Sequence, residues 1–166
     1  YFAQQFHSNT VENLLKIVRK SINLSILIAT VCSLLLLFIG DFSLSLIRSK
    51  VEHLDYLLWF LLSINILIER LGAMHFQLHS LSNKVIWHKA NIIYGIIFII
   101  ITYFTIDKIG MYSIPIAMLS GNVFHYTFKA IKTTYEEFSY NIYKFHSKII
   151  FYILILILIN LIFLLK

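Results

Sequence analysis

The sequence is short of charge, proline, glycine and cysteine. Only 13% of its 166 residues are charged, about half the roughly 25% that is usual in soluble domains. A soluble domain of this length leaves much of its surface in water, and this chain has too few charged residues to cover such a surface. One proline and five glycines leave few positions for tight turns, which disfavours a sheet protein. The single Cys32 excludes a disulfide within one chain.

Hydrophobic residues, by contrast, make up 59% of the chain and gather in five long runs. Each run is close to the roughly 17–25 residues that a helix needs to cross a bilayer. The runs cover residues 22–47, 54–73, 90–106, 109–128 and 149–165. The third and fifth are rich in isoleucine, which favours strands, but lipid accepts only helices or closed barrels, and the alternating polarity of a barrel is absent. We therefore predict a single all-α domain, a bundle of about five transmembrane helices.

Residues 1–21 are expected to form a cytoplasmic lead-in to the first run. Within it, residues 9–20 have the pattern of an amphipathic helix, which Asn9 or Thr10 would cap. Its apolar face is formed by Val11, Leu14, Leu15, Val18 and Ile22. Such a helix is predicted to lie at the membrane interface and to lead into the bilayer.

Basic residues are distributed unequally between alternate loops of the five-helix prediction. One side receives Arg48, Lys50, Lys108 and Lys166. The other side receives Lys16, Arg19, Lys20, Lys84, Lys89, Lys129, Lys132, Lys144 and Lys148. The positive-inside rule makes the second side cytoplasmic, with the N-terminus inside. The net charge of +6 is then explained by membrane topology, and no nucleic-acid partner is predicted. The short turn at Asp107 and Lys108 predicts that the third and fourth helices form an antiparallel hairpin.

Motifs for hydrolysis, redox chemistry or nucleotide binding do not occur in the sequence. His75 and His79 have the i, i+4 spacing of a metal-binding pair, but no third ligand is evident. We interpret them as interfacial residues near the cytoplasmic headgroups. No catalytic residue, metal or cofactor is predicted, and the chain is not expected to be an enzyme.

Glu69 and Arg70 are the ionisable residues that fall within the second run. Charges at membrane depth are costly and indicate function. One interpretation places Asn65, Glu69 and Gly72 along a polar cavity, with Arg70 beside them as an anion contact. The other has Arg70 extend along the helix to the headgroups.

The fourth run carries a second polar stripe. Met118, Asn122, His125 and Lys129 share one helical face. Pro115 and Gly121 are expected to loosen the helix. Together with Gly72 of the second run they are hinge or packing candidates. The stripe either lines a translocation path, with Asn122 and His125 facing the substrate, or packs against another helix through Gly121 and Ser120.

The order of these features resembles the C-terminal part of polysaccharide (O-antigen type) flippases of the multidrug/oligosaccharidyl-lipid/polysaccharide exporter superfamily. The lead-in and first run look like the family's loop after its eighth helix and its ninth helix: FHSNTVENLLKIVRK, then LLLLFIGDFSLSLI. The loop before the eleventh helix is similar to SLSNKVIWHKANIIYGIIFIIITYF, and the turn that opens the twelfth is similar to IDKIGMYSIPIAMLSGNVFHYTFKAIKTTYEEF.

The resemblance implies export of a lipid-linked oligosaccharide across the bacterial inner membrane by alternating access. The substrate pyrophosphate would then need a cationic contact, for which Arg70 is the candidate. The family's first eight helices have no counterpart here, and the chain begins with Tyr1. We therefore expect a piece of a longer transporter, whose missing N-terminal half is its partner in a lipopolysaccharide pathway.

Two other functions remain open. The first is a membrane-embedded enzyme of envelope glycan assembly, such as a polymerase, ligase or acyltransferase, although the predicted external loops are short for an active site. The second is a small helical subunit of a membrane complex, in which the polar stripes are packing contacts only.

Overall fold

The computed structural model describes residues 11–48, 55–82 and 87–164, and all regular structure in these ranges is helical. The long helices are α2 (Val11–Leu46), α3 (Tyr56–His79), α4 (Trp87–Ile109), α5 (Ser113–Gly121), α6 (Thr127–Phe138) and α7 (Ile142–Leu164). Short 3₁₀ segments cover Ser80–Ser82 and Gly110–Tyr112, and a π-helical segment covers Asn122–Tyr126. The all-α prediction is confirmed.

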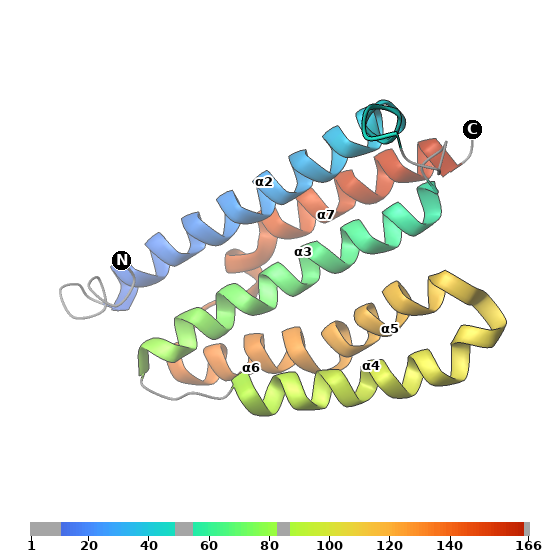
Figure 1. Cartoon of the computed structure of the whole chain (residues 1–166). Helices are drawn as coiled ribbons and strands as arrows, with labels where there is room; N and C mark the ends of the chain where they lie inside the picture. The colour runs from blue at the N-terminus through green and yellow to red at the C-terminus, as the bar shows by residue number, and fades with distance from the viewer. Residues whose placement is uncertain (1–10, 49–54, 83–86, 165–166) are drawn as a thin grey trace.

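Four helical stretches are long and apolar enough to cross a membrane in the described part of the chain. They are Val11–Leu46, Tyr56–His79, Trp87–Phe138 and Phe145–Ile162. The 52-residue stretch Trp87–Phe138 contains a reversal, so α4 packs against α5 as a hairpin (Figure 1). The reversal lies at Gly110, whose φ of 55° suits a residue without a side chain. The five predicted runs thus fall on α2, α3, α4, the α5–α6 rod and α7.

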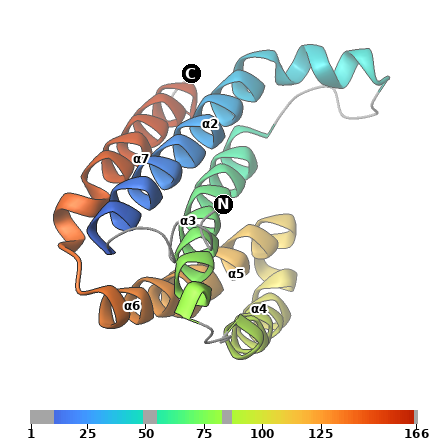
Figure 2. The same cartoon turned by 90° about the vertical axis from the view of Figure 1, so that its left-hand side faces the viewer.

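Helix α3 is the centre of the bundle. It packs against α2 and α7 on one side and against α5 and α6 on the other. Figures 1 and 2 show α7, α2 and α3 side by side, with the hairpin of α4 and α5–α6 beyond α3. A buried polar residue on α3 therefore faces one of two different interfaces, depending on its position around the helix.

The amphipathic helix predicted over residues 9–20 is present from Val11 onward, but it is not a separate helix. Its position at the membrane interface stays a prediction. From Val11 onward the residues form the first turns of α2, which continues unbroken into the first apolar run. Leu14, Val18 and Ile22 are fully buried in a core cluster that includes Phe145 of α7. The amphipathic pattern arises because protein, rather than lipid, covers the apolar face. The predicted caps Asn9 and Thr10 lie outside the described residues.

Large apolar side chains cover the outside of the bundle. Helix α4 is the clearest case, because Ala90 is its only buried residue. Its exposed side chains include Ile92, Ile96, Ile99, Ile100, Tyr103 and Phe104, each at least half exposed. A surface of this kind is stable in lipid and not in water. The chain is a membrane protein built from transmembrane helices.

Candidate functional site

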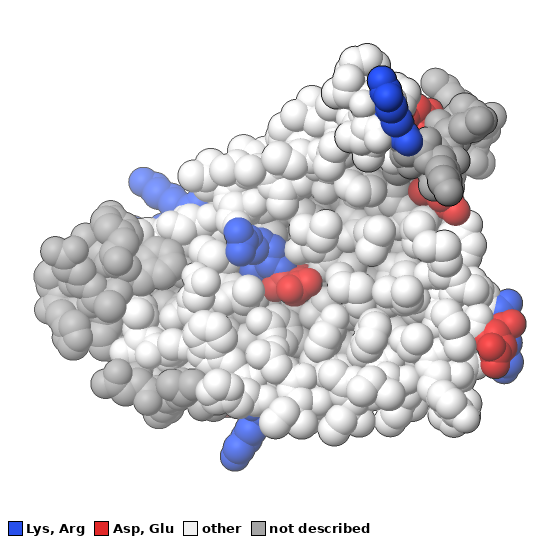
Figure 3. Space-filling view, in the orientation of Figure 1, with Lys and Arg blue, Asp and Glu red and all other residues white. Residues whose placement is uncertain are grey.

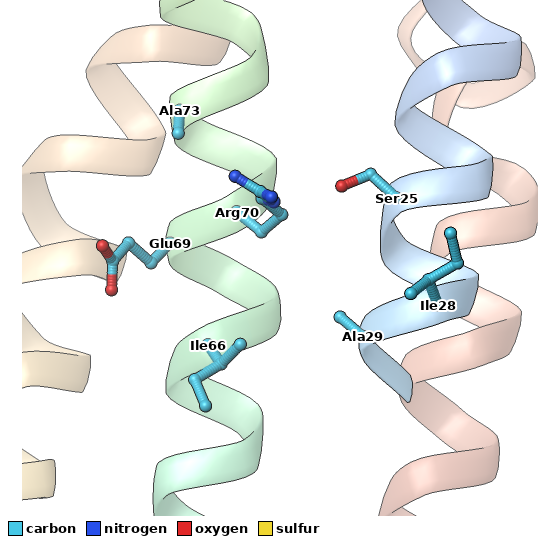
Figure 4. A pocket seen from close by; sticks show the side chains of 7 residues that line it. All are labelled: Ser25, Ile28, Ala29, Ile66, Glu69, Arg70 and Ala73. Atoms are coloured by element: carbon cyan, nitrogen blue, oxygen red, sulfur yellow. The ribbon is translucent and has the colours of Figure 1, made fainter. Parts of the chain in front are cut away.

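A groove of about 490 Å³ runs between α2 and α3 at the level of the charged pair (Figure 4). It is lined by Ser25, Ile28 and Ala29 of α2 and by Ile66, Glu69, Arg70 and Ala73 of α3. The side chain of Arg70 lies on the part of α3 nearer to Ser25, whereas Glu69 extends away from α2 (Figure 4). Adjacent helical residues point about 100° apart, which is why the two charges diverge.

Arg70 lies well inside the apolar length of α3. The helix has 24 residues, and Arg70 is nine residues before its end at His79. At about 1.5 Å per residue α3 is about 36 Å long, about 6 Å more than the hydrocarbon core. A centred α3 therefore places the Arg70 backbone about 10 Å inside the core.

The charged pair stands alone on an apolar face. Figure 3 shows one blue and one red group next to each other over α3, on a surface that is otherwise almost white. Glu69 and Arg70 are both exposed. Within the ranges that the structure describes, neither has an ion-pair partner. Because unpaired charges at membrane depth are costly, this arrangement indicates a site that a charged ligand or a second protein surface completes.

Glu69 also borders a smaller polar crevice on the other side of α3. The crevice measures about 60 Å³ and is lined by Glu69, Asn91, Tyr94, Asn122 and Tyr126. This space is enough for one or two water molecules at about 30 Å³ each. The carboxylate therefore faces amide and phenol groups, and Arg70 faces the groove.

Asn65 and Asn122 form a direct contact between α3 and the π-helical segment. Asn122 Nδ2 donates a hydrogen bond of 2.8 Å to Asn65 Oδ1, and both residues are 1% exposed. The prediction that Asn65, Glu69 and Gly72 line one cavity is wrong. The i, i+4, i+7 spacing does put them on one face of α3, but that face is covered by the α5–α6 rod, so Asn65 is sequestered by its partner.

Gly72 and Gly121 are sites of close helix approach, in line with their assignment as packing candidates. A Cβ atom at Gly72 would lie 2.7 Å from Thr127 Oγ1 of α6. That hydroxyl donates a hydrogen bond of 2.9 Å to the carbonyl of Ile68. A Cβ atom at Gly121 would lie 2.7 Å from the ring of Tyr94. Neither glycine borders the groove.

The helical irregularity falls after Gly121 and not at Pro115. Pro115 is buried in the first turn of α5, where a missing N–H removes no interior hydrogen bond. The π-helical turn Asn122–Tyr126 follows directly after Gly121. His125, on this turn, is half-buried and lines neither the groove nor the crevice. Of the proposed stripe, only Asn122 reaches a polar cavity that also contains Glu69.

His75 is fully buried, so its interpretation as an interfacial residue is wrong. Its Nε2 lies 3.0 Å from Nε2 of His146 on α7. Since His146 Nδ1 donates to the carbonyl of Ile142 at 2.8 Å, its Nε2 is free to accept, and His75 Nε2–H is the donor. Sequence reasoning missed this pair because its members are 71 positions apart. No group of three metal-ligand side chains occurs among the described residues.

Asp55 connects the start of α3 with the hairpin turn, a contact that no local sequence signal indicates. Its Oδ1 accepts a hydrogen bond of 3.0 Å from the Leu58 amide, as an N-cap. Its Oδ2 accepts one of 2.6 Å from the Tyr112 hydroxyl. The Leu58 amide, followed by the Tyr112 hydroxyl, holds the pKa of Asp55 below its usual value.

Comparisons with protein-family models, with curated proteins and with solved structures find no match for this chain. The function must therefore be argued from the groove and its chemistry.

Proposed function

We propose that the chain is part of an exporter that moves lipid-linked polysaccharide repeat units across the bacterial inner membrane. The observation that carries the proposal is the position of Arg70, a cation without an ion-pair partner among the described residues, in a groove whose other walls are mainly apolar. A lipid-linked glycan joins an apolar chain to a pyrophosphate, and such a groove offers a surface for each part. The resemblance of the sequence to O-antigen type flippases supports this substrate class.

The orientation of the two charges favours an anionic ligand in the α2–α3 groove. Arg70 presents a planar fork that binds two phosphate oxygens at once. Glu69 extends from the other side of α3, toward the crevice with Asn91 and Tyr94. Its carboxylate therefore does not occupy the guanidinium, which remains available to a phosphate.

The proposal includes a second helical half as a partner. Alternating access requires two halves that move about a central site, and the helices of this chain supply at most one. The exposed charges of α3 are suited to face that second half across the substrate path. We expect the 166-residue chain alone not to transport, and flipping by this chain in vesicles would refute that expectation.

The test compares Arg70→Lys and Arg70→Ala in the complete exporter, with transport measured per inserted molecule. If the guanidinium binds pyrophosphate bidentately, Arg70→Ala lowers transport by roughly tenfold to a hundredfold, and Arg70→Lys restores only part of it. Arg48→Lys, an arginine outside the groove, serves as the matched control. Near-normal export by Arg70→Lys would remove the substrate-contact assignment, because Lys also reaches the headgroups.

The Glu69→Gln variant tests whether Glu69 is part of the transport path or makes a structural contact in the crevice. If Glu69 is part of the transport path, the variant inserts normally and changes the activity per molecule. A lower protein abundance with unchanged activity per molecule would show that the crevice is held together by this carboxylate. The latter result favours the alternative of a helical subunit in a membrane complex.

A further inference from the structure

A second cavity, between the first half of α2 and the first part of α7, is lined by cationic side chains. It measures about 320 Å³. Its lining residues are Lys16, Arg19, Lys20 and Asn23 of α2 and Lys148 of α7. The four α2 residues follow the i, i+3, i+4, i+7 spacing of one helical face, and α7 packs alongside that helix. This cationic cavity is separate from the groove that contains Arg70.

The protein leaves the charge of this cavity largely uncompensated. Lys16 is 3.7 Å from Glu12, in a pair whose side chains are 67% and 82% exposed and which is therefore weak. In the described ranges no carboxylate lies within ion-pairing distance of Arg19, Lys20 or Lys148. Four neighbouring cations repel one another, so an anion that enters the cavity is bound favourably.

The surroundings of the cavity favour a lipid over a free phosphate. Leu24, Leu27 and Ile28 follow Asn23 along α2 and are exposed at 58%, 38% and 54%. They begin the apolar surface of the first transmembrane helix directly beyond the cationic residues. A lipid whose headgroup lies in the cavity would place its acyl chains against this apolar surface. A soluble anion has no apolar part that could contact it.

We propose that the cationic cavity binds the phosphate headgroup of an anionic glycerophospholipid. Basic pockets between transmembrane helices bind anionic headgroups in this way. The lipid would be bound near the N-terminal ends of α2 and α7. This site does not depend on the proposed transport function. Its effect is to fix the α2–α7 pair at one depth in the bilayer.

The test titrates the detergent-solubilised chain with phosphatidylglycerol and measures the dissociation constant by native mass spectrometry. Arg19→Gln combined with Lys148→Gln is expected to weaken binding about 25-fold, since each basic residue near an anionic lipid contributes roughly fivefold. The matched control, Lys108→Gln combined with Lys129→Gln, removes the same charge from exposed positions outside the cavity. Equal weakening by both double variants would overturn the proposal, because net charge alone would then explain the binding.

A further ligand identifies the source of the phosphate. Inorganic phosphate is expected to bind far more weakly than the lipid, and equal affinity would show a site for a free anion. The melting temperature in zwitterionic micelles, where no anionic lipid is present, should be the same for all variants.

Discussion

Buried polar side chains connect the helices of this bundle in pairs, and one of these pairs consists of two histidines. His75 and His146 stack with ring centroids 5.1 Å apart, and the rings of Tyr140 and Phe145 lie against His75. The Nε2–Nε2 hydrogen bond satisfies one nitrogen of each ring without water. His75 Nδ1 has no hydrogen-bond partner in the described structure, so the Nε2 contact is the one polar bond of that ring.

A double-mutant cycle tests this pair. His75→Leu and His146→Leu should each lower the free energy of unfolding by about 1–3 kcal/mol, since each leaves a buried polar group without its partner. The double variant should be less destabilised than the sum of the two, because both polar groups are then absent. Unfolding in detergent micelles measures all three. Additive losses would show that the two rings contribute independently and that the hydrogen bond adds nothing.

At the level of residues, the sequence indicates polarity but not partners. It singles out Asn65, Glu69, Arg70 and Asn122, because charged and amide side chains are rare in apolar runs. It assigns Asn65 to a cavity and His75 to the interface, and both assignments fail for one reason. Their partners, Asn122 and His146, lie 57 and 71 positions away, and helical periodicity carries no information about contacts at such distances.

Helix α3 approaches α6 closely at Gly72, which makes this contact sensitive to a single methyl group. Gly72→Ala should lower the free energy of unfolding by about 1–3 kcal/mol, because the new Cβ would lie 2.7 Å from Thr127 Oγ1 and 3.0 Å from the Thr127 backbone. Gly95→Ala is the matched control on α4, where nothing lies within 4 Å. It should be neutral or stabilising by about 1 kcal/mol, since Ala favours the helix. Similar losses from both would contradict the close approach.

The start of α3 and the hairpin turn are connected through Asp55, and this contact should depend on pH. The pKa of Asp55 in the folded protein is lower than the usual 3.8, so its contribution is fully present above pH 3.8 and is lost as the pH falls through the folded value. Tyr112→Phe removes the 2.6 Å hydrogen bond to the carboxylate. It should therefore lower the melting temperature at pH 7, and this decrease should become smaller as the pH falls below 3.8. A decrease that does not change with pH would mean that the bond does not involve the charged carboxylate.

At the level of elements, the positions of the helices were predictable and some of their limits were not. Run lengths and hydrophobicity located all five rods, because a bilayer sets the length of a helix. The fifth helix begins at Ile142, earlier than the predicted residue 149, because polar residues at the end of a rod extend the helix without adding to its apolar run. The lead-in is part of α2 for the same reason, because the helix extends beyond the apolar run.

For the whole molecule, the orientation of the helical rods in the membrane can be tested directly. The structure places the start of α2 and the end of α3 at the same end of the bundle (Figure 1). Nine basic residues against four predict that this end is cytoplasmic. The cationic cavity of α2 and α7 would then face the inner leaflet, where anionic lipids give the surface its negative potential.

Reporter fusions test this orientation. Fusions after Lys50 and Lys108 should report an external position, and fusions after Lys84 and Lys132 an internal one, because successive helices alternate in direction. The hairpin makes the Lys108 fusion the most informative, since the rods on either side of it, α4 and α5–α6, return to the same end (Figure 2). An internal signal at Lys108 together with an external signal at Lys84 would show that the whole bundle has the opposite orientation in the membrane. The cationic cavity would then face outward, and the positive-inside rule would not govern this chain.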